Sequence, residues 1–336
     1  MRKLSEQLEI FGMTEVVRRI EMEPVPVSDK RRLLRRVELT HEMLTALPAP
    51  DDLSFLHSGL CQTCLPHSRP SDNRDVWRRS SGRFSLLVAP GVINEPGSPS
   101  GSKEVAGIRY VGVPYGSRAR LIMIYLQTEG LKGRIVPLGK SLSAFLRSLG
   151  LPITGGARGS ITAIREQSLR IARCNITMQW TSTEASGLQK SVLSDTRIVD
   201  GLELWQSDRA DEWCGFVELS EKFYENLQEH AVPLDKRAIS HLSGNSLGLD
   251  LYTLLAYRLP RLNRDLHLRW SNLQSQIGSS ETVGSSLAQR VREVMPDVFT
   301  AYPQANVEIG PHGLLLKPSK PAVPKTIVGG YRMVGS

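Results

Sequence analysis

The predicted fold depends on the stretch Ser141-Leu-Ser-Ala-Phe-Leu-Arg-Ser-Leu-Gly-Leu-Pro-Ile-Thr-Gly-Gly-Ala-Arg-Gly-Ser-Ile-Thr-Ala-Ile-Arg-Glu-Gln-Ser-Leu-Arg-Ile-Ala-Arg173. Apolar residues at helical spacing predict a helix over 141–149, and Gly150 followed by Pro152 ends it. A glycine-rich turn then leads into a helix predicted over 160–174. Two helices joined in this way are typical of helix-turn-helix proteins, which place the second helix in the major groove of DNA.

The flanking sequence completes a larger pattern. An apolar helix is predicted over 117–131 and a short strand over 134–138. After the stretch come a strand at 175–180, a polar tip at 181–191, and strands at 192–207 and 212–218. Three helices, a short strand and a hairpin follow one another in the order of a winged helix. The hairpin tip would be the wing, and Lys190 on it is predicted to contact phosphate or the minor groove.

The same order recurs without residue identity. The second copy has a helix at 247–255, a strand at 266–270, a small helix at 271–277, a long helix after the turn 278–284, and a hairpin at 306–317. We therefore expect an α+β fold with tandem winged-helix domains and a helical N-terminal extension. The predicted domains are 1–50 (helical extension), 51–220 (first winged helix with β-rich elaboration), 221–318 (second winged helix) and 319–336 (disordered basic tail).

Residues 1–47 predict two helices divided by Pro24 and Pro26. Their acidic and basic side chains balance. A solvated helical arm, a DNA-contacting arm and a coiled-coil dimer seam all remain open, although no heptad repeat is sustained.

Positive charge is concentrated in one segment. Residues 116–173 carry ten basic and two acidic residues, so their net charge of +8 equals the formal charge of the whole 336-residue chain. A clustered positive field attracts polyanions, nucleic acid above all.

The helix at 160–174 offers side chains that can contact DNA. Ile161, Ile164, Ser168, Ile171 and Ala172 are predicted to face the core, which would turn the opposite face outward. Arginine can pair with guanine, glutamine with adenine, and glutamate with cytosine. The candidate DNA-binding residues are Arg158, Ser160, Thr162, Arg165, Glu166, Gln167, Arg170, Arg173 and Lys190, with Ser286, Gln289 and Arg290 in the second copy. The second copy has a weaker footprint, so DNA reading and dimerisation both remain open for it.

A possible metal site lies upstream. His57, Cys61, Cys64 and His67 have spacing that could supply four zinc ligands. All four come from one short span, whereas structural zinc sites usually join two separated pairs. We therefore favour a structural segment with Cys61 buried, and expect neither a metal nor a cofactor.

Enzyme signatures are lacking in the sequence. The run Gly133–Ser141 resembles a phosphate-binding loop but has five residues between its glycines where that motif needs four. No histidine pair for a nicking nuclease, nucleophile elbow or paired-carboxylate cluster is found, so we expect no catalytic residues.

No apolar run approaches the roughly 20 residues of a membrane span, and Glu6 and Glu9 argue against a signal peptide. We expect a cytoplasmic protein.

Several sequence segments resemble those of the RepA-type plasmid replication initiators of proteobacteria. They are Leu60-Cys-Gln-Thr-Cys-Leu-Pro-His67, Trp77-Arg-Arg79, the run 113–129, Ile164-Arg-Glu-Gln-Ser-Leu-Arg-Ile-Ala-Arg-Cys174, the run 250–259, and Tyr302-Pro-Gln-Ala-Asn-Val-Glu-Ile309 with the run 313–319. The resemblance implies a protein that binds repeated sites in double-stranded origin DNA, helps melt the duplex and recruits the host initiator DnaA and the replicative helicase. Homodimerisation stays possible. A winged-helix transcriptional regulator is the alternative function.

Overall fold

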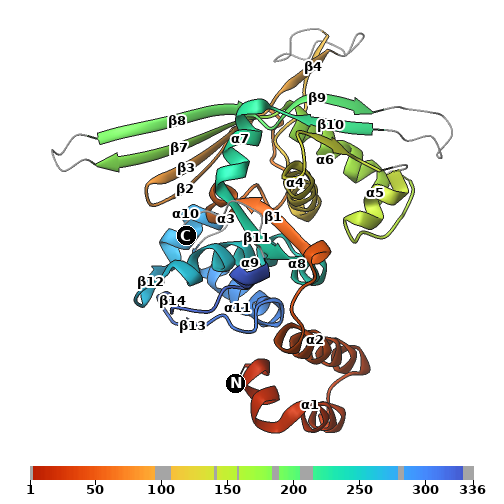
Figure 1. Ribbon diagram of the computed structural model, residues 1–336, viewed down its shortest axis with the longest axis vertical. Coiled ribbons are helices and arrows are strands. Elements are labelled where there is room, and N and C mark those ends of the chain that lie inside the picture. Colours follow the sequence, from red (N-terminus) through yellow and green to blue (C-terminus); the bar gives the residue numbers. More distant parts are fainter. Residues whose placement is uncertain are drawn as a thin grey trace. The chain divides into compact units, whose positions relative to one another are not determined.

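The computed structural model describes residues 3–94, 107–139, 142–156, 159–183, 189–204, 215–278 and 284–327 (Figure 1). Helices and small antiparallel sheets together confirm the predicted α+β class. By compactness the chain forms two units, each made from separate stretches of sequence. Unit 1 comprises residues 1–54, 233–274 and 282–331, and unit 2 comprises residues 55–232, 275–281 and 332–336.

Unit 2 contains the helices and strands predicted around the basic stretch. Their bounds are α4 (Gly116–Gly130), β6 (Ile135–Pro137), α5 (Leu142–Ser148), α6 (Ser160–Arg173), β9 (Val199–Leu204) and β10 (Gly215–Leu219). The three strands form an antiparallel sheet in the order β6-β10-β9, with Val217 opposite Val136. Helix α6 packs on α4, α5 and β9. Phe145, Ile164 and Ile171 are buried at this junction because their apolar side chains lie on the inner faces of α5 and α6.

The predicted hairpin after α6 is present, but it does not pair with β6 as a wing would. Its strands β7 (Asn175–Thr183) and β8 (Gln189–Arg197) extend a sheet with β2 (Trp77–Ser81) and β3 (Phe84–Ala89). Apolar residues alternate on β3 and β7, and Leu86 lies opposite Met178 so that both are buried. The hairpin of the β6 sheet is β9–β10, and the residues connecting its strands lie outside the described part of the chain.

Unit 2 is completed by smaller elements. They are α3 (Ser58–Gln62), the hairpin of β4 (Val92–Asn94) with β5 (Ile108–Tyr110), and α7 (Glu221–His230). A Cβ atom on Gly91 would lie 2.0 Å from the backbone oxygen of Arg173, so the base of the β4–β5 hairpin lies tightly against the end of α6. The chain passes between the units within β1 (Leu53–His57) and β11 (Ala231–Asp235), which pair with each other.

Unit 1 repeats the order of elements seen in unit 2. Its elements are α8 (Lys236–Leu242), α9 (Ser246–Arg258), η2 (Leu259–Arg261), β12 (Leu266–Arg269), α10 (Trp270–Ile277), α11 (Gly284–Ala301), β13 (Val307–Ile309) and β14 (Gly313–Leu316), with α10 ending across the unit boundary. The sheet order is β12-β14-β13, so the last strand lies in the middle, as it does in β6-β10-β9. The predicted repeat of architecture is therefore confirmed.

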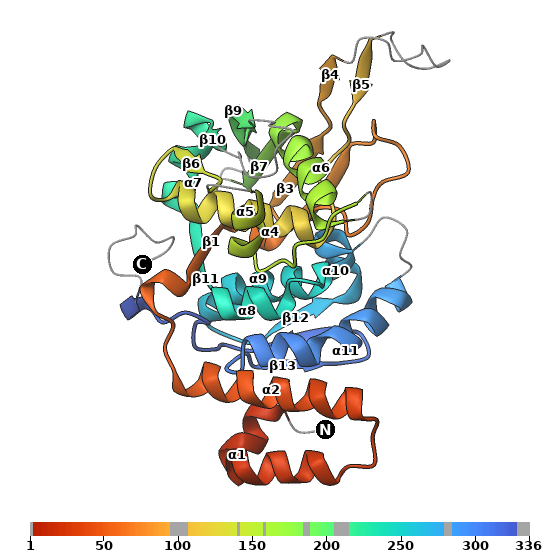
Figure 2. The same cartoon turned by 90° about the vertical axis from the view of Figure 1, so that its right-hand side faces the viewer.

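Two helices open the sequence, as predicted. Helices α1 (Leu4–Met22) and α2 (Val27–Thr45) pack through a small apolar cluster that includes Leu8, Val16 and Val37, and η1 (Pro50–Asp52) follows them. Helix α2 also lies along α11 of the same unit (Figure 2). The buried guanidinium of Arg36 pairs there with Asp297 at 2.9 Å.

Two sequence expectations concern the membrane and the tail. Among the described residues, no helix combines the length and the apolar composition needed to span a bilayer. Part of the segment expected to be disordered is described: residues 319–327 include the buried Val323 and η3 (Lys325–Ile327), and the hydroxyl of Tyr302 donates to the backbone oxygen of Lys320 at 2.6 Å.

Candidate nucleic-acid interface

Helix α6 begins at a reciprocal hydrogen-bonded turn. The Ser160 amide donates to the Thr154 hydroxyl at 2.9 Å, and the Thr154 amide donates to the Ser160 hydroxyl at 2.9 Å. These bonds satisfy a backbone amide of the first turn, which has no partner inside the helix. Ser160 is consequently buried, and its hydroxyl is used within the fold. Because Ser160 is buried, it is not placed to make the predicted contact with DNA.

The outward face of α6 carries two arginines. Thr162, Arg165 and Arg173 are exposed, and Leu169 lies between them, half-buried, on the same face. Three- and four-residue steps place these side chains above one another along the helix. This arrangement suits a helix lying in a groove, where positions along one face contact successive bases or phosphates. Sequence reasoning missed Leu169, although its spacing from Arg165 and Arg173 was visible.

The prediction that Arg170 points out of the helix is wrong. The exposed fraction is 2% for Arg170 and 3% for Gln167, because α6 is oriented so that both side chains face the core. The Gln167 side-chain oxygen accepts from the Tyr115 amide at 2.8 Å. Arg170 Nη1 donates to the Val113 carbonyl at 3.1 Å. Sequence patterning treats charged and amide side chains as exposed, whereas both side chains here satisfy buried backbone groups.

Further contacts hold Arg170 in place. Its guanidinium pairs with Glu166 at 2.9 Å, donates to the Asn73 side chain at 3.2 Å and lies over the Tyr115 ring at 5.1 Å from the centroid. Gly112 has φ +79°, and a Cβ atom there would lie 2.0 Å from Arg170 Nη1. Arg170 therefore fastens the segment before α4 to α6 and fixes which face of α6 is turned outward.

The other cations of the basic segment are divided between structure and surface. Arg120 is buried and donates to the carbonyls of Leu65 and Pro66 at 2.6 and 3.1 Å. Lys132 pairs with Glu129, and Arg134 with Glu218. Arg147 lies on the surface. Lys140 and the candidate DNA-binding residue Arg158 lie outside the described residues. Because several cations of this segment are used within the fold, its exposed positive surface is smaller than the number of basic residues suggested.

The second copy presents a weaker outward face. Gln289 is exposed but donates to Glu293 at 3.0 Å, and Arg290 is half-buried. Other faces of α11 pack on α8, α9 and α2. The side chains of Lys190 and Ser286 lie outside the described part of the structure. The acidic side chain of Glu293 beside Gln289 opposes binding to phosphate.

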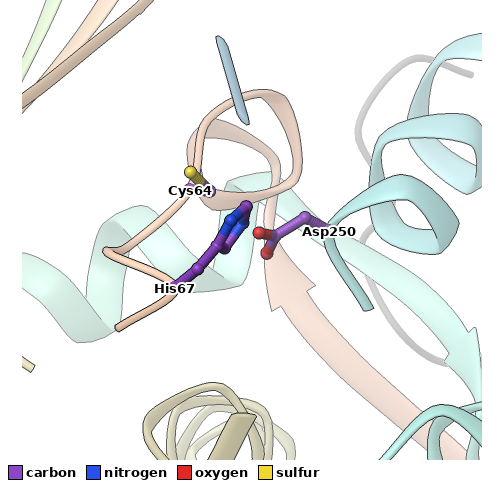
Figure 3. A group of neighbouring side chains, drawn as sticks. All are labelled: Cys64, His67 and Asp250. Carbon is purple, nitrogen blue, oxygen red and sulfur yellow. The ribbon is translucent and has the colours of Figure 1, made fainter. Parts of the chain in front are cut away.

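The four possible zinc ligands do not come together. His57 Nδ1 accepts from the Gly59 amide at 3.0 Å, and its Nε2 lies 2.5 Å from the Asn226 side-chain oxygen, so both ring nitrogens are used. Cys61 is buried, with its sulfur facing the Leu56 carbonyl at 3.8 Å. Among the described residues, the one group of three or more possible ligands with atoms within 4.8 Å of one another includes Cys64 and His67 but neither His57 nor Cys61 (Figure 3). Asp250, also labelled in that figure, belongs to unit 1.

Burial controls the titration of His57. Its surroundings remove water and hence lower the pKa of the imidazole to about 4, despite the hydrogen bond to Asn226. Because Nδ1 accepts a hydrogen bond, the proton of the neutral ring is on Nε2, which donates to Asn226. The ring also lies edge-on to His230, with centroids 5.6 Å apart. His57 is therefore a neutral, structural histidine at physiological pH.

Comparisons with known proteins bear on this region. Residues 113–273 match the family described as plasmid encoded RepA protein, which confirms the resemblance found in the sequence. No curated protein matches the chain. A crystal structure of domains 2 and 3 of RctB aligns with a TM-score of 0.44 and 12% identity, covering 71% of this chain and 84% of that one. A second structure of the same domains aligns at 0.41 and 13%, covering 70% and 82%.

Proposed function

We propose that this chain, whose residues 113–273 match the plasmid-encoded RepA family, is a replication initiator that binds repeated sites in its plasmid's origin. The family match carries the proposal. It begins just before α4, includes α5 and α6 with the exposed Arg165 and Arg173, and ends within α10. It therefore includes the whole helix-strand-helix-helix-hairpin module of unit 2 and part of the module in unit 1.

In this proposal the module of unit 2 is a DNA-binding winged helix, and α6 enters the major groove. Arg165 and Arg173 are exposed on one face, where guanidinium groups can pair with guanine edges or phosphates. Buried Arg170 acts as a positioning residue, because it holds α6 against the segment before α4. Because Arg170 is buried, it does not read bases in this arrangement.

The remaining steps follow from the family resemblance. We propose that binding to several sites promotes opening of the duplex, and that the bound protein recruits DnaA and the replicative helicase in the cytoplasm. The module of unit 1 serves as a second DNA-binding or a dimerisation element. The mixed charge around Gln289 and Glu293 favours dimerisation over base reading.

Footprinting on the DNA that flanks the gene tests this function. Protection of several direct repeats, together with plasmid replication that depends on the protein, is the expected result. Protection of one palindrome with no effect on replication would support the alternative, a winged-helix transcriptional regulator. Scrambled duplexes of equal length and composition provide the control for sequence-independent electrostatic binding.

A further inference from the structure

A cavity of about 390 Å³ lies within unit 2, and none of the residues that line it belongs to α6. It lies between the loop that follows α3 and the first residues of β2. Its wall includes Arg69, Asp75, Trp77, Arg78, Arg79 and Val113. This volume falls in the range of pockets that hold small ligands.

Positive charge dominates the cavity wall. Arg69 and Arg78 are exposed, and neither guanidinium has a hydrogen bond to another described residue. The single carboxylate, on Asp75, is turned into its own loop, where it accepts from the Asp72 amide at 3.2 Å and the Ser71 hydroxyl at 3.5 Å. The wall therefore offers donors to an anion and little to a cation.

The third arginine of the wall is held rigidly. Arg79 lies 3.6 Å from the centroid of the Trp77 ring, and its Nε and Nη2 donate to the Gly278 carbonyl at 2.9 and 2.6 Å. The Trp77 indole in turn donates to the Cys64 carbonyl at 2.6 Å. Arg79 and Trp77 are thus preorganised, and a preorganised group loses less entropy when a ligand binds.

We propose that this cavity binds the phosphate group of a nucleotide, with Arg69 and Arg78 as its ligands and Arg79 as a fixed positive charge behind them. Guanidinium groups match phosphate oxygens in geometry and form two parallel hydrogen bonds to them. A concave cavity of this volume can hold the phosphate ester of a nucleotide. The phosphate can come from a free nucleotide or from a single-stranded end, and both share this chemistry.

Calorimetric titration of the full chain with pyrophosphate, ADP and a 5′-phosphorylated (dT)4 tests the proposal. We expect saturable binding of at least one probe. Arg69→Ala and Arg78→Ala should each weaken it at least about tenfold, the loss expected when a hydrogen bond to a charged group is removed. ADP binding would identify a free nucleotide as the source, and binding of (dT)4 alone a strand end.

Arg83→Ala is the matched control, since Arg83 is an exposed arginine on the same β2–β3 hairpin but is not part of the cavity wall. It should bind every probe like the wild type. The proposal is overturned if no probe binds saturably at millimolar concentration, or if the Arg69 and Arg78 variants bind as well as the control. Retained binding of duplex DNA by these variants would separate a failure here from a failure of the proposed initiator function.

Discussion

The guanidinium of Arg170 donates a hydrogen bond to the backbone carbonyl of Val113 at 3.1 Å, and both residues are buried. A helix in the middle of the basic segment is thereby tied to the chain that enters α4. Charge in this segment consequently has two uses. Some arginines are exposed for a partner, and others hold together the structure that presents them.

We expect Arg170→Ala to lower the free energy of unfolding by about 2–3 kcal/mol, because it leaves the buried Val113 carbonyl without its charged donor. Urea denaturation of the full chain measures this loss. Arg173→Ala, on the exposed side of the same helix, should stay within about 0.5 kcal/mol of the wild type. Equal stabilities for the two variants would contradict the structural role of Arg170.

The outward face of α6 makes a separate prediction about DNA. Arg165→Ala and Arg173→Ala should each cost about 1–3 kcal/mol on the specific site where they pair with a base. A variant that loses a phosphate contact instead should weaken binding to all sequences and reduce the salt slope by about one unit. Titrations on specific and scrambled duplexes distinguish these outcomes, with Lys132→Ala as the control. Wild-type affinity in the Arg165/Arg173 double variant would show that α6 is not the reading helix.

The depressed pKa of His57 predicts a pH dependence of stability. The folded pKa is about 4 and the unfolded value about 6.5, so the unfolded chain binds the extra proton between these pH values. The stabilisation is therefore present above pH 6.5 and is lost as the pH falls to 4, by up to about 3 kcal/mol.

The measurement for His57 is the free energy of unfolding at several pH values between 7 and 4. Carboxylates also titrate in this range, so the comparison is with His57→Gln, which cannot take up the proton. The free energy of unfolding of the His57→Gln variant should fall less steeply with decreasing pH. The difference in slope from the wild type should correspond to about one bound proton. Parallel curves for the two proteins would show that His57 is not buried in its neutral form.

The Cys61–Cys64 segment should be metal-free. His57 uses both ring nitrogens inside the fold, so it cannot complete a four-ligand site with its neighbours. We expect substoichiometric zinc in purified protein and an unchanged Tm after chelation. One tightly held zinc per chain, released together with unfolding, would refute this expectation.

Local patterns predicted the helices better than they predicted their contacts. The observed bounds of α6 lie within one residue of the predicted 160–174, because Gly159 and the run of helix-forming residues after it are visible in the sequence. Its orientation depends on Gln167 and Arg170 reaching backbone groups before α4, and no periodicity in α6 indicates this. The wing was misplaced for a similar reason: β7 pairs with β3, which lies far away in sequence.

Helix α2 completes its packing against α11 through Arg36 and Asp297, although nearly all of unit 2 lies between them in the sequence. At typical elongation rates, α11 is synthesised roughly 10–50 s after α2, so this face of α2 has no partner during that interval. Unit 2 can fold in that interval, while the first two helices stay available to chaperones or to other newly made chains. We therefore expect the order of emergence from the ribosome to favour unit 2 first, with unit 1 closing last around the final third of the sequence.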